Sequence, residues 1–275
     1  MEKPIFLLFS LAGAALAQGG SFGVPFVRRS NPSSYINSRA ASTSTVTVGA
    51  VAESYFAVGT PPVQFLALLD TGSSDLVVET AVQASSCVGC ETTGPLYSAS
   101  SSSSAVITTT PVDLLYAIGN DTGVIVTDLV SFGGFSMQQT MAACDVNDLF
   151  ASVGASTALL GLGWTNLAVT NSTPFFQQLW ESGLLSKPVF GLGFAESAAD
   201  QAGSTLLPGG YLTLGDTNST LHSGEITWVP LAENGTGYWD VPVDNTLVNG
   251  RNLGMSTTVA VIDSSGDFDR DAEAS

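Results

Sequence analysis

Short apolar runs separated by turn-forming residues restrict the possible folds of this sequence more than any other feature. The runs begin at about Val51, and glycine, proline and asparagine stand between them, as at Gly59-Thr60-Pro61-Pro62 and Pro208-Gly209-Gly210. Many short strands at such spacing are typical of an all-β sandwich or barrel. The expected strands are Val63–Leu69, Leu76–Val78, Val106–Thr109, Gly123–Ser131, Ala158–Leu160, Val189–Phe194, Tyr211–Leu214 and Ile226–Leu231.

One clear helix signal interrupts this pattern, at residues 173–183. Thr173 can cap the helix, Pro174 suits its first turn, and Gly183 can end it. The side chains expected to form its buried face are Phe175, Phe176, Leu179 and Trp180.

The charge balance excludes several classes of protein. The 275 residues include 7 Lys+Arg and 24 Asp+Glu, for a net charge of −17, so no basic face for nucleic acid can form. With 44% hydrophobic and only 11% charged residues, the chain is expected to form a packed core rather than remain disordered. The single histidine, His222, cannot build a zinc site of several histidines.

Residues 1–17 are expected to be a signal peptide. A short charged start precedes the apolar run Ile5–Ala17, and Ala15-Leu16-Ala17 supplies small residues for a signal peptidase. The run is too short to span a bilayer, although a buried N-terminal helix is an alternative. No later apolar stretch approaches the ~20 residues of a membrane span, so we expect a secreted, soluble protein that does not enter a membrane.

Two further features agree with secretion. Residues 18–48 are rich in Gly, Ser and Thr with little periodicity, which indicates a prosegment or a linker. Candidate N-glycosylation sites of the Asn-x-Ser/Thr type occur at Asn120, Asn171, Asn218 and Asn234.

The three cysteines leave several readings open. In a secreted protein, Cys87 and Cys90 can close a small loop as a disulfide. A redox CxxC motif and half of a zinc site are the alternatives. Cys144 is then left over, and it is either buried and free or paired outside this chain.

The segment Leu68–Val78, LLDTGSSDLVV, is the candidate for chemistry. An apolar strand runs directly into Asp70, where an unpaired carboxylate would be costly to bury. Gly72 and the hydroxyls of Thr71 and Ser73 offer nearby hydrogen-bond donors, and a carboxylate held in this way suits acid–base chemistry on water. The alternative is an Asp-initiated turn between two strands.

This segment closely resembles the N-terminal active-site segment of pepsin-like aspartic proteases, especially the fungal ones. The resemblance continues in order along most of the chain. The matching segments are Tyr55–Phe65, Cys87–Cys90, Tyr116–Gly119 with Thr122-Gly123 and Asp128, Leu159–Gly163, residues 173–183, Val189–Phe194, Gly209–Gly215, Gly224–Pro230 and Gly237–Trp239.

The resemblance implies an all-β, bilobal pepsin-like acid protease fold. Residues 49–190 would be a complete N-terminal β lobe with the active-site turn and the flap, and residues 191–275 would be an incomplete C-terminal β lobe. Residues 18–48 would be the prosegment of a zymogen, and Cys87–Cys90 would form the small disulfide loop. We expect a monomer that acts on protein or peptide substrates and needs no metal or cofactor.

The resemblance also assigns roles within the site. Asp70 and Asp263 would be the two catalytic carboxylates, which share one proton and activate one water to attack a peptide bond at acid pH. Ser73 would hydrogen-bond the outer oxygen of Asp70. Thr71, Gly72 and Ser264 would support the active-site turns, and the flap would carry Tyr116 and Gly119.

The second active-site turn, Val259–Gly266 (VAVIDSSG), departs from the family pattern. Ser265 stands where glycine is expected after Asp263 and Ser264, and a Cβ there would obstruct close approach of the backbone. Val77 also replaces the usual tryptophan behind the flap. These departures leave a catalytically inactive, truncated relative as one alternative to an active peptidase. The Ser/Thr-rich strands and the sequons leave a second alternative, a secreted β-rich binding or cell-wall protein.

Overall fold

The computed structural model describes residues 5–10, 22–27, 53–80, 94–116, 119–145, 156–194, 208–232, 235–245, 247–248, 251–254 and 258–265. The predicted Cys87–Cys90 disulfide, the sequon at Asn234 and Gly266 lie outside these residues. No helix in the described part of the chain is long and apolar enough to cross a membrane.

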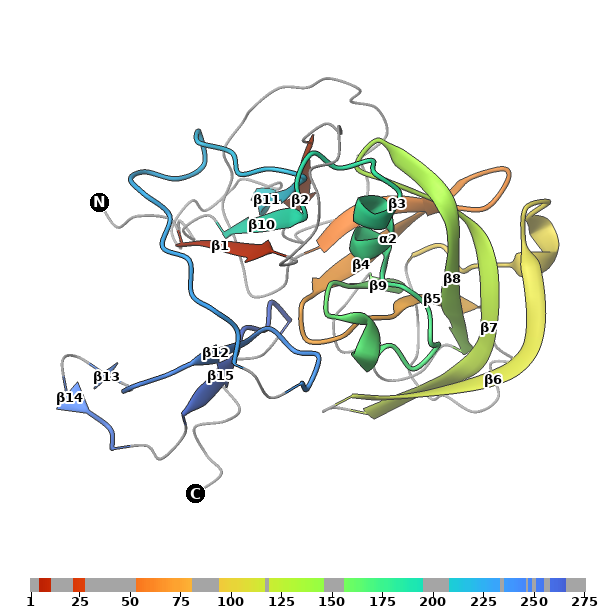
Figure 1. Ribbon diagram of the computed structural model, residues 1–275. Helices are drawn as coiled ribbons and strands as arrows, with labels where there is room; N and C mark the ends of the chain where they lie inside the picture. Colours follow the sequence, from red (N-terminus) through yellow and green to blue (C-terminus); the bar gives the residue numbers. More distant parts are fainter. Residues whose placement is uncertain are drawn as a thin grey trace, which may run out of the picture.

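A seven-stranded sheet forms the larger part of the described structure (Figure 1). Two of its neighbouring pairs are parallel, β4–β9 and β5–β8, and β3 also pairs with β7, which brings distant parts of the sheet together. The predicted all-β class is confirmed. In spatial order the strands are β3 (Glu53–Val58), β4 (Val63–Asp70), β9 (Ala158–Gly161), β5 (Leu76–Thr80), β8 (Phe135–Asp145), β7 (Gly119–Phe132) and β6 (Val106–Tyr116).

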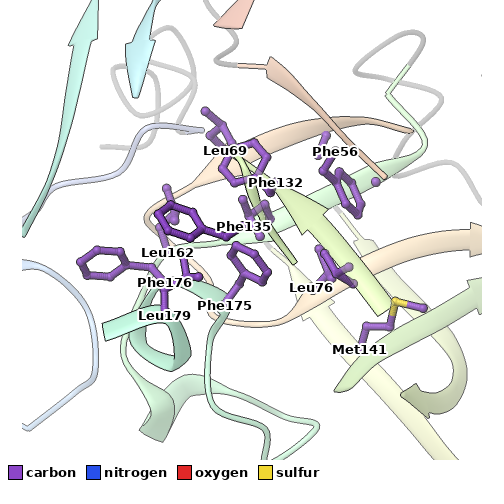
Figure 2. Packing of buried hydrophobic residues seen from close by; sticks show 14 of the residues in the cluster. Phe56, Leu69, Leu76, Phe132, Phe135, Met141, Leu162, Phe175, Phe176 and Leu179 are labelled. Atoms are coloured by element: carbon purple, nitrogen blue, oxygen red, sulfur yellow. The ribbon is translucent and has the colours of Figure 1, made fainter. Parts of the chain in front are cut away.

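The main core lies between this sheet and the helix α2 (Phe175–Glu181), where large apolar side chains meet (Figure 2). The predicted buried face of the helix is confirmed, because Phe175, Phe176, Leu179 and Trp180 are all at most 9% exposed. The predicted cap is wrong: the helix starts after Pro174 at its N-cap, and no side chain caps it. Gly183 ends the helix with a φ of 70°, a conformation that glycine adopts without strain.

A second, four-stranded sheet has the order β1 (Ile5–Ser10), β10 (Val189–Phe194), β11 (Pro208–Leu214) and β2 (Phe22–Val27). All of its neighbouring strands are antiparallel. Ile5–Ser10 is therefore a strand, and the alternative of an N-terminal helix is wrong for these residues. The signal peptide and the prosegment stay predictions.

The remaining elements are short. The strands β12 (Asp240–Pro242) and β15 (Val259–Val261) pair with each other, as do β13 (Leu247–Val248) and β14 (Arg251–Asn252). The 3-10 turns η1 (Ala99–Ser101) and η2 (Thr165–Leu167) contain no buried residues.

The predicted strand Ile226–Leu231 is wrong. The segment forms no strand, and Trp228 and Val229 remain 54% and 53% exposed. A strand needs a hydrogen-bonding partner along its edge, and no described strand lies in register with this segment.

Candidate active site

Asp70 is the last residue of β4, and the apolar strand before it carries its carboxyl group to the end of the large sheet. The side chain is only 3% exposed. Two donors from the following turn satisfy it: the Gly72 amide donates to Oδ1 at 2.8 Å, and the Ser73 hydroxyl donates to Oδ2 at 2.5 Å. The turn therefore holds a buried carboxylate in a fixed orientation.

The end of β9 and the residues after it pack against this turn. Asp70 pairs with Gly161 in parallel register, and the Gly163 amide donates to the Ser73 carbonyl at 2.7 Å. A Cβ at Gly161 or Gly163 would lie 2.4 or 2.6 Å from atoms of Ser74. Only glycine permits this approach, because real Cβ atoms do not come so close to other heavy atoms.

Trp239 links the C-terminal segment to the same support. Its indole N–H donates to the Leu162 carbonyl at 2.9 Å, and its own carbonyl accepts from the Ile262 amide at 3.0 Å. The ring packs against Trp164 and Phe190, with centroid distances of 4.9 and 5.6 Å. One buried side chain therefore fixes where Asp263, the residue after Ile262, lies relative to the large sheet.

The two candidate turns are joined by reciprocal hydrogen bonds. The Thr71 hydroxyl accepts from the Ser264 amide at 2.9 Å and donates to the Ile262 carbonyl at 2.8 Å. In return, the Ser264 hydroxyl accepts from the Thr71 amide at 3.0 Å and donates to the Leu69 carbonyl at 2.6 Å. This arrangement gives the two turns a two-fold pattern, although their sequences differ.

Gly72 and Ser265 occupy matching places in that pattern. The Gly72 amide donates to Asp70 Oδ1, and the Ser265 amide donates to Asp263 Oδ1, both at 2.8 Å. A Cβ at Gly72 would lie 2.7 Å from Asp263 Oδ2, so a side chain there would displace the Asp263 carboxyl group. Ser265 does carry a side chain, and its hydroxyl contacts Asp70 Oδ1 at 2.7 Å and Asp263 Oδ1 at 3.0 Å.

The two carboxyl groups have unequal surroundings. Burial, followed by the charge of Asp263, raises the pKa of Asp70 above its usual value, against the opposing hydrogen bonds from Ser73, Ser265 and Gly72. Asp263 is exposed to solvent. Burial therefore favours the protonated form of Asp70.

The predicted flap is an antiparallel hairpin of β6 and β7, in which Tyr116 pairs with Gly119. Tyr116 packs against a second apolar cluster that contains Val77, the residue in the place of the expected tryptophan. Burial, and then the charges of Asp121 and Asp70, raise the pKa of the Tyr116 phenol. The charge of Asp70 therefore acts on the Tyr116 phenol.

The remaining predicted residues are spread over the molecule. Asn120, at the hairpin, and Asn171 are exposed, and Asn218 is half-buried. The Asn120 amide donates to Asp113 across the hairpin at 3.1 Å. Cys144 is a free and fully buried thiol whose pKa is raised, chiefly by burial.

Sequence reasoning did not identify the roles of Trp239 and Asp75. Asp75 is 4% exposed and accepts hydrogen bonds from the Val169 amide at 2.8 Å and from the Thr170 amide at 3.1 Å. The signal available in the sequence was its position, because Asp75 comes five residues after Asp70 and directly before the buried strand β5. Nothing in the local sequence of Trp239 indicates its contact with Leu162.

Comparison with known proteins identifies the class. The family model for eukaryotic aspartyl protease matches residues 54–268, and the chain belongs to this family. With its mostly β structure, this membership confirms the predicted resemblance and the pepsin-like fold.

Individual relatives agree with this assignment. Pepsin A of Canis lupus familiaris is 30% identical over 202 residues, which are 72% of this chain and 49% of the relative. Pepsin A-5 of Mus musculus is 31% identical over 196 residues, 70% of this chain and 47% of the relative. A fungal protein, major aspartyl peptidase 1 of Cryptococcus neoformans var. grubii, is 28% identical over 205 residues, 73% and 41% of the two chains. The chain spans about half the length of the curated relatives it matches.

Proposed function

We propose that this protein is a secreted aspartic endopeptidase that hydrolyses peptide bonds in proteins at acid pH through a water activated by Asp70 and Asp263. The observation that carries the proposal is the contact of both carboxyl groups with one oxygen atom, Ser265 Oγ, at 2.7 and 3.0 Å. The two groups are therefore close enough to act on one small molecule. Membership of the aspartyl protease family supports the same reaction class.

The unequal surroundings of the two carboxyl groups indicate which one acts as the acid and which as the base. Two carboxylates so close together do not both ionise readily, so the pair holds one proton over a range of acid pH, as in other aspartic proteases. Burial favours that proton on Asp70, which leaves Asp263 as the base. Asp263 takes a proton from the water, and the water oxygen bonds to the peptide carbonyl carbon. Asp70 donates its proton to the carbonyl oxygen.

The tetrahedral diol then collapses. The proton held by Asp263 passes to the leaving nitrogen, the C–N bond breaks, and a hydroxyl proton of the diol returns to Asp70. No covalent bond to the enzyme is formed. Ser73 and Gly72 hold Asp70 in place through these steps, and the hairpin that carries Tyr116 and Gly119 closes over the substrate and excludes water.

Asp70→Asn tests this proposal. Digestion of denatured haemoglobin or casein at acid pH is expected to fall by roughly 10³-fold or more, because the acid of the pair is lost. Asp244→Asn is the matched control, since Asp244 is exposed and belongs to neither turn. A pepstatin-type inhibitor should suppress the native activity. Native digestion that persists in Asp70→Asn would show that another group carries it.

The remaining parts of the proposal concern processing. Cleavage after residue 17, removal of the prosegment 18–48, a Cys87–Cys90 disulfide and glycans at Asn120, Asn171, Asn218 and Asn234 would each change the mass of the protein recovered from culture medium. Intact mass spectrometry before and after reduction and glycosidase treatment measures them. A secreted monomer without these mass changes would contradict the zymogen and glycoprotein assignments.

A catalytically inactive relative is the second candidate. The observation in its favour is the presence of a side chain at Ser265, at the place that matches Gly72 in the first turn. An active peptidase needs a water between the two carboxyl groups, whereas in the inactive relative the Ser265 side chain stays there.

A further inference from the structure

The Ser265 hydroxyl lies where a water shared by the two carboxyl groups would have to lie. Such a water must be within hydrogen-bond distance of one oxygen of each group, and Ser265 Oγ already meets that condition at 2.7 Å from Asp70 Oδ1 and 3.0 Å from Asp263 Oδ1. These two oxygens also accept the Gly72 and Ser265 amides, so they are the matching oxygens of the two turns. Two oxygen atoms cannot occupy one position.

The proton count of a hydroxyl group also fits this position. Ser265 Oγ carries one hydrogen, so it can donate to only one carboxylate, and its lone pairs can accept from the other group when that group is protonated. A pair that holds one proton therefore satisfies both contacts. The hydroxyl makes with the dyad the hydrogen bonds that water would otherwise make.

We propose that Ser265 occupies the position of the nucleophilic water, so that the dyad hydrolyses peptides only when this side chain turns away or is replaced. The inference rests on the proposed function, because it assumes that a water between Asp70 and Asp263 is the nucleophile. Ser265 is exposed, which gives its side chain room to turn toward solvent. The measured rate then scales with the fraction of molecules in which the position is open.

Two substitutions separate occupancy of the position from loss of the hydroxyl. Ser265→Gly removes every side-chain atom, restores the pattern of the first turn and admits water. Ser265→Ala removes the hydroxyl but keeps Cβ, which lies one covalent bond from the contested position and still excludes a water oxygen. We expect kcat/KM for peptide cleavage at acid pH to rise about tenfold or more in Ser265→Gly, and to stay at or below the native value in Ser265→Ala. Equal activation by the two variants would overturn the inference.

Crystal structures of the native chain and of Ser265→Gly test the inference without activity. The native structure should show Ser265 Oγ between the carboxyl groups, and the glycine variant should show a water there. A water in contact with both carboxyl groups in the native protein, with Ser265 turned away, would overturn the inference whatever the activity. If the glycine variant holds the water but cleaves nothing, the inference stands and the proposed peptidase function fails. If that variant does not fold, the native structure decides alone.

Discussion

Glu79 should make the folded protein much more stable in acid than at neutral pH. It lies on β5, its side chain is 0% exposed, and neither carboxyl oxygen accepts a hydrogen bond from the described part of the chain. In the parallel pairing of β5 and β8 it stands opposite Cys144, which is also fully buried. Burial, and then the charge of Asp121, raise its pKa from 4.5 to about 8.

The sign and size of the effect follow from this shift. Because the folded protein binds the Glu79 proton more tightly than the unfolded chain, the stabilisation is complete below about pH 4.5 and is lost as the pH rises through about 8. The change corresponds to roughly 4–5 kcal/mol, on the order of half the stability of a typical domain. Raising the pH to neutral therefore weakens the fold, while burial, which raises the pKa of the neighbouring Cys144 thiol, keeps that thiol protonated.

Urea denaturation followed by tryptophan fluorescence, between about pH 4 and about pH 8.5, measures the free energy of unfolding. Glu79→Gln should remove most of the loss seen on raising the pH. It should cost about 1–3 kcal/mol in acid, because the buried amide has no partner. Above about pH 8 the variant should be the more stable protein. The control is Glu181→Gln, on the exposed side of α2, which should keep the native pH dependence. If Glu79→Gln also keeps the native pH dependence of the free energy of unfolding, Glu79 is not its cause.

Two more predictions concern the contacts between the two active-site turns. Thr71→Val removes two hydrogen bonds and leaves the Ser264 amide without its acceptor, so the free energy of unfolding in urea should fall by about 2–4 kcal/mol, whereas Thr71→Ser should lose about 1 kcal/mol or less. Equal losses in the two variants would show that the hydroxyl does not join the turns. Trp239→Phe loses the hydrogen bond to Leu162, so the free energy of unfolding should fall by about 1–3 kcal/mol, and kcat should change more than KM. The control Trp228→Phe, at a residue that is 54% exposed, should change neither stability nor kcat. A kcat unchanged in Trp239→Phe would show that this side chain does not position Asp263.

The sequence allowed most strands of the large sheet to be predicted, because their apolar runs are continuous and end at turn residues. Val63–Leu69 differs from β4 by one residue, and in the four-stranded sheet Val189–Phe194 coincides with β10. Strand β8 was not predicted, since Gln138 and Gln139 break its alternation of apolar and polar residues. Gln139 is nevertheless 1% exposed, because its amide reaches the carbonyls of Thr140 and Thr173. The error at Ile226–Leu231 has the opposite cause, an apolar run without a partner strand.

The site divides in the same way between local and distant contacts. The hold of Gly72 and Ser73 on Asp70 spans at most three residues, so the motif alone predicts it. The contacts of Asp263 and Ser265 with the first turn span more than 190 residues and depend on where Trp239 packs. From sequence, a side chain at Ser265 suggested obstruction of the backbone. The structure instead directs its hydroxyl between the two carboxyl groups.

Asp128 limits how far the free energy of unfolding can rise as the pH falls. Asp128 is fully buried, yet it accepts hydrogen bonds from Tyr97, Ser102 and Ser104. These bonds outweigh the opposing effect of burial and lower its pKa. Its stabilisation is therefore present above the usual aspartate value of 3.8 and is lost as the pH falls below it. Glu79 stabilises the fold at low pH, whereas the stabilisation by Asp128 is lost at very low pH, so together these two buried carboxyl groups favour moderate acid, the range in which the proposed peptidase would act.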